Sequence, residues 1–130
     1  MRRAKLNGHS VLIPSEQDLT RIFSILDVFV HPATFREGFG LTILEAMAAM
    51  VPVVATNIWA LNSIIRNEVN GFLVEPKQAD ALASVIENVL AHPAHAESVA
   101  RNAYEQARAS YSIDRMVREM ETVYREIARS

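Results

Sequence analysis

Cysteine is absent from the 130-residue chain, which excludes disulfide bonds and thiolate catalysis and permits an intracellular location. No apolar run reaches the roughly 20 residues that a membrane-spanning helix needs. The net charge of −2 excludes a broad electrostatic attraction to nucleic acid. Walker A and Gly-x-Ser-x-Gly sequences are also missing, so neither a P-loop nor a serine-hydrolase elbow is indicated.

What is present is typical of one globular domain. Half of the residues are hydrophobic and 22% are charged, and 130 residues suffice for a real core. Residues 1–10 are expected to be a flexible basic N-terminus, and residues 11–130 the domain. The N-terminus lacks the apolar segment of a signal peptide, so at most peripheral contact with a membrane is expected.

Hydrophobic periodicity and turn residues predict alternating strands and helices. The expected strands are 11–14, 28–31, 53–55 and 71–74, and the expected helices are 15–25, 41–50, 60–65, 79–91, 94–109 and a last one capped by Ser112. Such alternation predicts an α/β fold: a Rossmann-like parallel sheet of about four strands with flanking helices and a helical C-terminus. Methionine and tyrosine side chains in an apolar stripe on the last helix are interpreted as core.

The segment from Arg36 to Met47 carries the candidate site. A glycine-containing turn precedes a helix, whose first N–H groups lack internal partners and lie at the positive end of its dipole. Such an end binds phosphate without a lysine, and glycines let the ligand approach the backbone. Two carboxylates, Glu37 and Glu45, flank this anion site and suit the hydroxyl groups of sugars. Each carboxylate has a plainer reading, as a surface charge in a loop or on a helix.

A family resemblance rests on four motifs in succession. Glu37 and Glu45 are separated by seven residues around Gly-Phe-Gly-Leu, with Asp-Val-Phe-Val-His-Pro before them. Val-Pro-Val-Val-Ala-Thr and Asn-Gly-Phe-Leu-Val-Glu-Pro follow. From about residue 11 onward, the chain resembles the donor-binding C-terminal domain of retaining glycosyltransferases of the GT-B fold, in the family often called family 4.

The resemblance implies transfer of a sugar, with retention, from a UDP-sugar or GDP-sugar to an acceptor. Glu37 would contact the donor sugar as the catalytic-site carboxylate, and Glu45 the ribose. The resemblance implies no cofactor, and the lack of an Asp-x-Asp sequence argues against a metal–diphosphate site. The implied donor-binding residues are Glu37, Gly38, Phe39, Gly40, Leu41, Thr42 and Glu45. Phe39 is read mainly as packing, with a useful backbone N–H.

The sequence also departs from the family. Trp59 and Ala60 stand where the family has a glycine pair, and Ser63 is near a glutamate position. Trp59 is expected either to close that loop or to form an acceptor or partner surface. The family's N-terminal acceptor domain, and the strands that bring arginine and lysine to the diphosphate, have no counterpart here. The chain alone is therefore expected to be poorly active and to need that part in cis or in trans.

Alternatives remain at several points. The rival functions are a non-catalytic nucleotide-sugar-binding or assembly module and a GT-B-like nucleotide-sugar epimerase. His31 is either a packed histidine or a catalytic base, and His92 with His95 is a weak metal candidate. The missing central strand would leave strand 28–31 with an open edge, which either residues 11–13 or a second chain in a homodimer would cover. The expected location is the cytoplasm, including the inner membrane surface.

Overall fold

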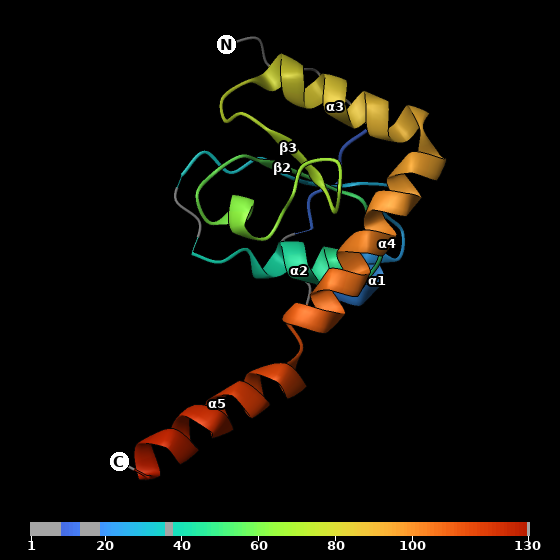
Figure 1. Ribbon diagram of the computed structural model, residues 1–130. Coiled ribbons are helices and arrows are strands. Elements are labelled where there is room, and N and C mark those ends of the chain that lie inside the picture. The colour runs from blue at the N-terminus through green and yellow to red at the C-terminus, as the bar shows by residue number, and fades with distance from the viewer. Residues whose placement is uncertain (1–8, 14–18, 36–37, 130) are drawn as a thin grey trace.

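The computed structural model describes residues 9–13, 19–35 and 38–129 of the chain (Figure 1). Its elements alternate between strand and helix up to β3 and are helical thereafter. In chain order they are α1 (Leu19–Phe23), β1 (Phe29–His31), α2 (Leu41–Ala48), β2 (Val53–Thr56), the 3₁₀ helix η1 (Leu61–Ser63), β3 (Phe72–Val74), α3 (Ala79–Ala91), α4 (Pro93–Ser110) and α5 (Ile113–Ala128).

The three strands form one parallel sheet in the order β1-β2-β3. Both pairings are in simple register, with Val54 beside Val30 and Phe72. The expected α/β class with a parallel sheet and a helical C-terminus is therefore confirmed.

The prediction of a buried strand at the start of the domain was wrong. Val11 and Leu12 are 88% and 91% exposed and Ile13 is half exposed, and the three residues form no strand. An apolar run of three residues gains strand structure only when a sheet edge pairs with it, and no edge does so here. The described sheet consequently has three strands rather than about four.

Helices cover both faces of the sheet. Because successive strand residues point to opposite faces, Val53 and Ala55 pack with α2 while Val54 packs toward α3. Figure 1 shows α3 above the sheet, α2 below it and α4 running between the two helices along one side. The core therefore has two halves with the sheet between them, and its parallel strands are apolar throughout, as strands covered on both faces are.

The side chain of buried Asn70 links the loop before β3 to α4 by hydrogen bonds. It is 2% exposed, its side-chain oxygen accepts from the Arg66 N–H at 2.6 Å, and its side-chain nitrogen donates to the Ile64 carbonyl at 3.0 Å. The same nitrogen donates to Gln106 on α4. The Asn-Gly turn signal in the sequence thus marks a residue that also holds two distant segments together.

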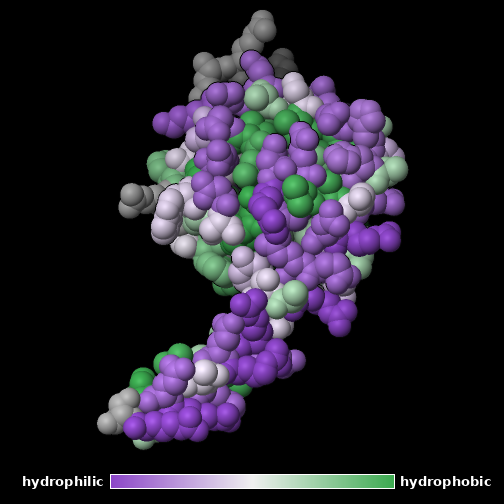
Figure 2. Space-filling model, in the orientation of Figure 1, coloured by the Kyte–Doolittle hydropathy of each residue, from purple (hydrophilic) through white to green (hydrophobic). Residues whose placement is uncertain are grey.

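The last helix leaves the body of the molecule, and its predicted place in the core was wrong. Figures 1 and 2 show α5 projecting away from the body, and none of its described residues is buried. The exposed stripe comprises Ile113, Met116, Val117, Met120, Val123, Tyr124 and Ile127. The amphipathic pattern correctly identified a helix with an apolar face, but nothing among the described residues covers that face.

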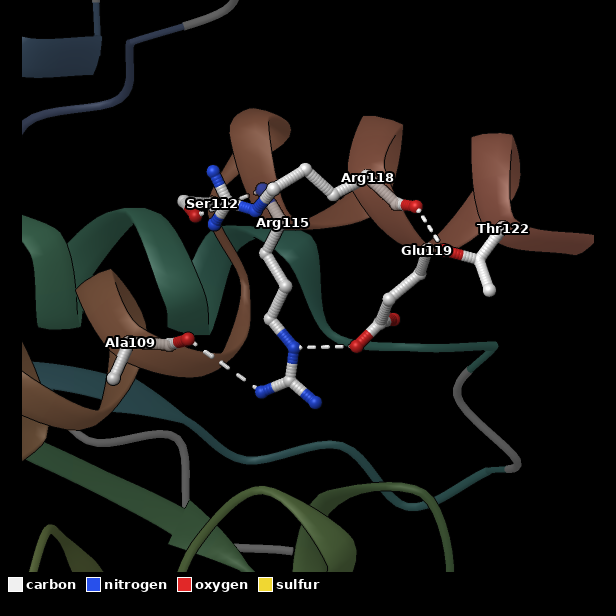
Figure 3. A network of polar contacts seen from close by, with 6 residues as sticks. All are labelled: Ala109, Ser112, Arg115, Arg118, Glu119 and Thr122. Carbon is white, nitrogen blue, oxygen red and sulfur yellow. Dashed lines mark hydrogen bonds and ion pairs between the residues drawn. The ribbon is translucent and has the colours of Figure 1, made fainter.

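The start of α5 agrees with prediction. The Ser112 side chain accepts a hydrogen bond from the Arg115 N–H at 3.4 Å, as an N-cap residue does. Figure 3 shows the adjoining network, in which the Arg115 side chain reaches Glu119 at 2.7 Å one turn later. These local contacts support the helix without tertiary packing.

The outer edge of β1 is paired with no strand among the described residues. Coverage of this edge by residues 11–13 is excluded by their exposed, non-strand conformation. Coverage by a second chain stays a prediction. Of the helices described, every one is too short or too polar to cross a membrane.

Candidate functional site

The candidate site lies at the carboxyl ends of the three strands, where ligands bind in open parallel sheets. The loop from β1 to α2 begins there, directly after His31. Thr56, at the end of β2 and 4% exposed, donates its hydroxyl to the Ala33 carbonyl at 2.6 Å. This bond fixes the start of the loop against the neighbouring strand.

The first turn of α2 presents two backbone donors. The Gly40 carbonyl accepts from the N–H groups of Ile43 and Leu44 at 3.0 and 3.3 Å. The N–H groups of Leu41 and Thr42 have no acceptor among the described residues, and no side chain caps the helix. Free donors at the positive end of a helix are suited to a phosphate.

Gly40 is required by the backbone at this point. Its φ and ψ are 83° and 44°, in the left-handed region that is unfavourable for residues other than glycine. A Cβ atom here would lie 2.8 Å from the Leu61 Cδ2 atom. Gly38 differs, because its φ is not positive and an added Cβ would have no neighbour within 4 Å. Of the two predicted turn glycines, Gly40 alone meets both constraints.

Glu45 lies on the exposed side of α2, one turn beyond Leu41. Ile43, Ala46 and Met47 turn the opposite side into the core. The predicted position of Glu45 in the second turn of this helix is confirmed, and its carboxylate is on the solvent side. Glu37, with Arg36, lies outside the described residues, so its position relative to Glu45 stays a prediction.

Phe39 combines packing with exposure. Its side chain is 49% exposed, and its ring meets Tyr111 edge to face with centroids 6.1 Å apart. This contact ties the glycine turn to the junction of α4 and α5. Leu41 is 66% exposed, so its backbone rather than its side chain is the group that the fold holds in place.

Two cavities border the loop between β1 and α2. One of about 310 Å³ is lined by Gly38, Phe39, Trp59, Ala60, Asn62 and Ser63. The other, of about 200 Å³, is lined by Pro32, Thr34, Thr56, Glu75, Lys77, Gln78, Ala79 and Leu82. Sequence reasoning missed Lys77 as a cation at this edge of the sheet. Its place three residues after β3 could have indicated it, because the residues that follow parallel strands gather at one edge.

His31, His92 and His95 each contact a neighbouring ring or a backbone carbonyl. The ring of His31 lies 6.3 Å from that of Phe29, and the ring of His95 meets Phe72 edge to face at 5.9 Å. The His92 Nδ1 atom is 2.9 Å from the Asn88 carbonyl oxygen. The described residues include no group of three or more side chains that could hold a metal ion.

Comparison with known proteins shows the family of the chain. The model of the family described as glycosyl transferases group 1 matches residues 2–106. An uncharacterized glycosyltransferase of Methanocaldococcus jannaschii is 37% identical over 82% of this chain and 27% of its own length. The capsular polysaccharide biosynthesis glycosyltransferase CapM of Staphylococcus aureus is 32% identical over 91% of this chain and 31% of its own.

Among solved structures, HepE of Anabaena in complex with UDP superposes with a TM-score of 0.82 and 25% identity. That match covers 85% of this chain and 30% of HepE, which has also been crystallised with UDP-glucose. The chain thus spans less than a third of the length of these relatives. Its fold is part of a GT-B glycosyltransferase, and the chain belongs to the glycosyl transferases group 1 family.

Proposed function

We propose that this chain is the donor-binding portion of a retaining glycosyltransferase that uses a nucleoside-diphosphate sugar. The observation that carries the proposal is the start of α2: two unpaired N–H groups follow a buried left-handed glycine, and a carboxylate lies one turn further on. Diphosphate, ribose and sugar are the three parts that such a site must recognise. The complexes of HepE with UDP and UDP-glucose support a uridine donor.

In this proposal each group has one task. The N–H groups of Leu41 and Thr42 bind the phosphate next to the sugar and stabilise the charge that grows on it as the glycosidic bond breaks. Glu45 accepts hydrogen bonds from the ribose hydroxyls. Glu37 holds hydroxyls of the sugar, and the sequence offers no Asp-x-Asp pair for a metal-dependent route. Retention, and the GDP-sugar alternative, follow from the family resemblance.

Calorimetric titration with UDP and with UDP-glucose tests the proposal. The unmodified chain should bind both with dissociation constants in the high-micromolar to millimolar range, about 4–6 kcal/mol of binding free energy. Glu45→Ala should weaken both ligands by about 1–3 kcal/mol, the cost of removing a charged hydrogen-bond partner. Glu37→Ala should weaken UDP-glucose more than UDP, because its assigned partner is the sugar.

Glu87→Ala is the matched control, since Glu87 is an exposed glutamate on α3 outside the site. Its titrations should equal those of the unmodified chain. Equal losses of UDP and UDP-glucose in Glu37→Ala would remove the sugar-binding role of Glu37. Unchanged binding in Glu45→Ala would remove the ribose-binding role of Glu45.

A further inference from the structure

Trp59 is the one tryptophan of the chain, and its side chain is 83% exposed. It lies in the loop after β2, where it lines the cavity of about 310 Å³ together with Gly38 and Phe39. An exposed indole offers a large apolar face, and beside a cavity that face is available to a ligand bound there.

The backbone holds Trp59 in this exposed position. Both backbone polar groups of the preceding residue, Ile58, are hydrogen-bonded. Its N–H donates to the Thr56 carbonyl at 2.9 Å, and its carbonyl accepts from the Leu61 N–H at 2.9 Å. The neighbouring Ala60 and Leu61 are 8% and 0% exposed. The loop is therefore anchored in the core next to Trp59, and this anchor holds the Trp59 backbone at the surface beside the cavity.

The cavity offers an aromatic surface and a few polar groups. The side-chain amide of Asn62 makes no hydrogen bond within the described part of the chain. The Ser63 hydroxyl donates to the Ala60 carbonyl at 2.7 Å. A hexopyranose ring has the matching chemistry, with an apolar face of C–H groups and a rim of hydroxyls. The amide can both donate to and accept from such hydroxyls.

The position of the cavity also fits a sugar better than a nucleobase. Gly38 opens one wall, because no side chain fills the space beside it, and Glu45 is not among the lining residues. With ribose at Glu45 and phosphate at the first turn of α2, the other ring of the donor falls on the Gly38 side. A volume of about 310 Å³ is at the lower end for ligand pockets and accommodates one ring rather than a whole nucleotide-sugar.

We propose that this cavity binds a hexopyranose ring against the indole face of Trp59, with Asn62 contacting the ring hydroxyls. This inference rests on the proposed function and adds a residue that contacts the sugar. The ring is either the glycosyl group of the donor or a free sugar, and the two sources are separable in one experiment.

The experiment uses the intrinsic fluorescence of the full chain, because a single tryptophan reports on this cavity alone. Acrylamide quenching is measured without ligand, with UDP, with UDP-glucose, and with glucose in the presence of UDP. A ring stacked on the indole lowers the quenching constant. Protection by UDP-glucose but not by UDP supports a donor sugar, and protection by glucose added with UDP supports a free sugar as the source.

Calorimetry on variants provides the second readout. Trp59→Ala should weaken UDP-glucose about tenfold and leave UDP unchanged, while Trp59→Phe should keep most of the affinity because it keeps an aromatic face. Phe35→Ala is the matched control, since Phe35 is 84% exposed but does not line this cavity. Circular dichroism of each variant verifies that the fold is intact.

Two failures are distinguishable. If UDP-glucose binds by calorimetry with the same affinity in Trp59→Ala, and neither UDP-glucose nor glucose added with UDP protects Trp59, the sugar site at Trp59 is refuted while the proposed function stands. If UDP and UDP-glucose do not bind the unmodified chain, and GDP and a GDP-sugar do not bind it either, the proposed function is refuted together with the donor site.

Discussion

Gly40 shows at the scale of one residue how the chain makes its candidate site. A left-handed φ of 83° lets the backbone turn from the loop into α2, and the space where a Cβ would stand is occupied by Leu61. Because the same residue also supplies the carbonyl that starts the helix, its conformation determines where the free N–H groups of α2 point.

Gly40→Ala should therefore lower the free energy of unfolding by about 2–4 kcal/mol, combining left-handed strain with overpacking against Leu61. Gly38→Ala should change it by less than about 0.5 kcal/mol, since its added Cβ meets nothing within 4 Å. Urea denaturation of both variants measures the difference. Similar losses for the two would mean that the conformation of Gly40 is not what makes it necessary.

Met50 lies at the C-terminal end of α2 and shows how this element is terminated. The Val51 N–H donates to the Ala46 carbonyl and the Met50 N–H to the Met47 carbonyl, both at 3.0 Å. This pattern is the Schellman motif, whose left-handed position glycine usually fills. Here that position is Met50, with φ of 57°.

Met50→Gly should raise the free energy of unfolding by about 1 kcal/mol, because glycine adopts the left-handed region without strain. Ala49→Gly provides the control at the preceding position, where φ is −87° and glycine has no advantage. It should lower stability by about 0.5–1 kcal/mol. Thermal or urea unfolding reads out the sign, and a loss of stability in Met50→Gly would contradict the strain assigned to Met50.

Element boundaries show what local sequence information can determine. The helix from Ala79 to Ala91 and the N-cap at Ser112 were predicted correctly, because amphipathic spacing and capping residues are local signals. Residues 60–65 gave only the short 3₁₀ helix Leu61–Ser63. Residues 11–13 gave no strand, because strand formation requires a neighbouring strand, which no local signal specifies.

At the scale of the whole molecule, the body and α5 should contribute very differently to stability. Met47 is 0% exposed in the core, whereas Met120 is 47% exposed on α5, none of whose described residues is buried. Met47→Ala should cost about 2–5 kcal/mol of the free energy of unfolding. Met120→Ala should cost less than about 0.5 kcal/mol, since alanine is also a good helix former.

Urea denaturation followed by circular dichroism compares the two methionine variants directly. A large loss in Met120→Ala would show that the apolar face of α5 is covered in solution. Because the compared side chains are identical, differences in hydrophobicity between residue types cannot explain the result.

The turnover expected of the 130-residue chain by itself is low. A transferase must exclude water and hold donor and acceptor in reacting geometry, and the two cavities beside the loop between β1 and α2 both lie at one edge of a single sheet. One missing preorganised donor to the leaving group typically costs about 10²–10³ in rate. Binding of UDP should therefore survive better than transfer.

A transfer assay with UDP-glucose, run with the chain alone and with the remaining part of a family member added, measures this. Added protein should raise the rate, and Glu37→Ala should abolish the gain. Robust transfer by the purified chain alone would disprove the expectation, and isomerisation of the free nucleotide-sugar would favour the epimerase alternative.

The sequence by itself determined the family, the α/β class, the position of most elements and the identity of the glycine turn before α2. These properties depend on local patterns, in which spacing, capping and backbone preference act within a few residues. The tertiary structure decided which of the predicted segments pack against, or pair with, other parts of the chain. It gave Gly40 its left-handed conformation against Leu61, left residues 11–13 outside the sheet, and placed Trp59 beside a cavity. It also left α5 uncovered, because an amphipathic stripe specifies that a face is apolar but not which surface will bury it.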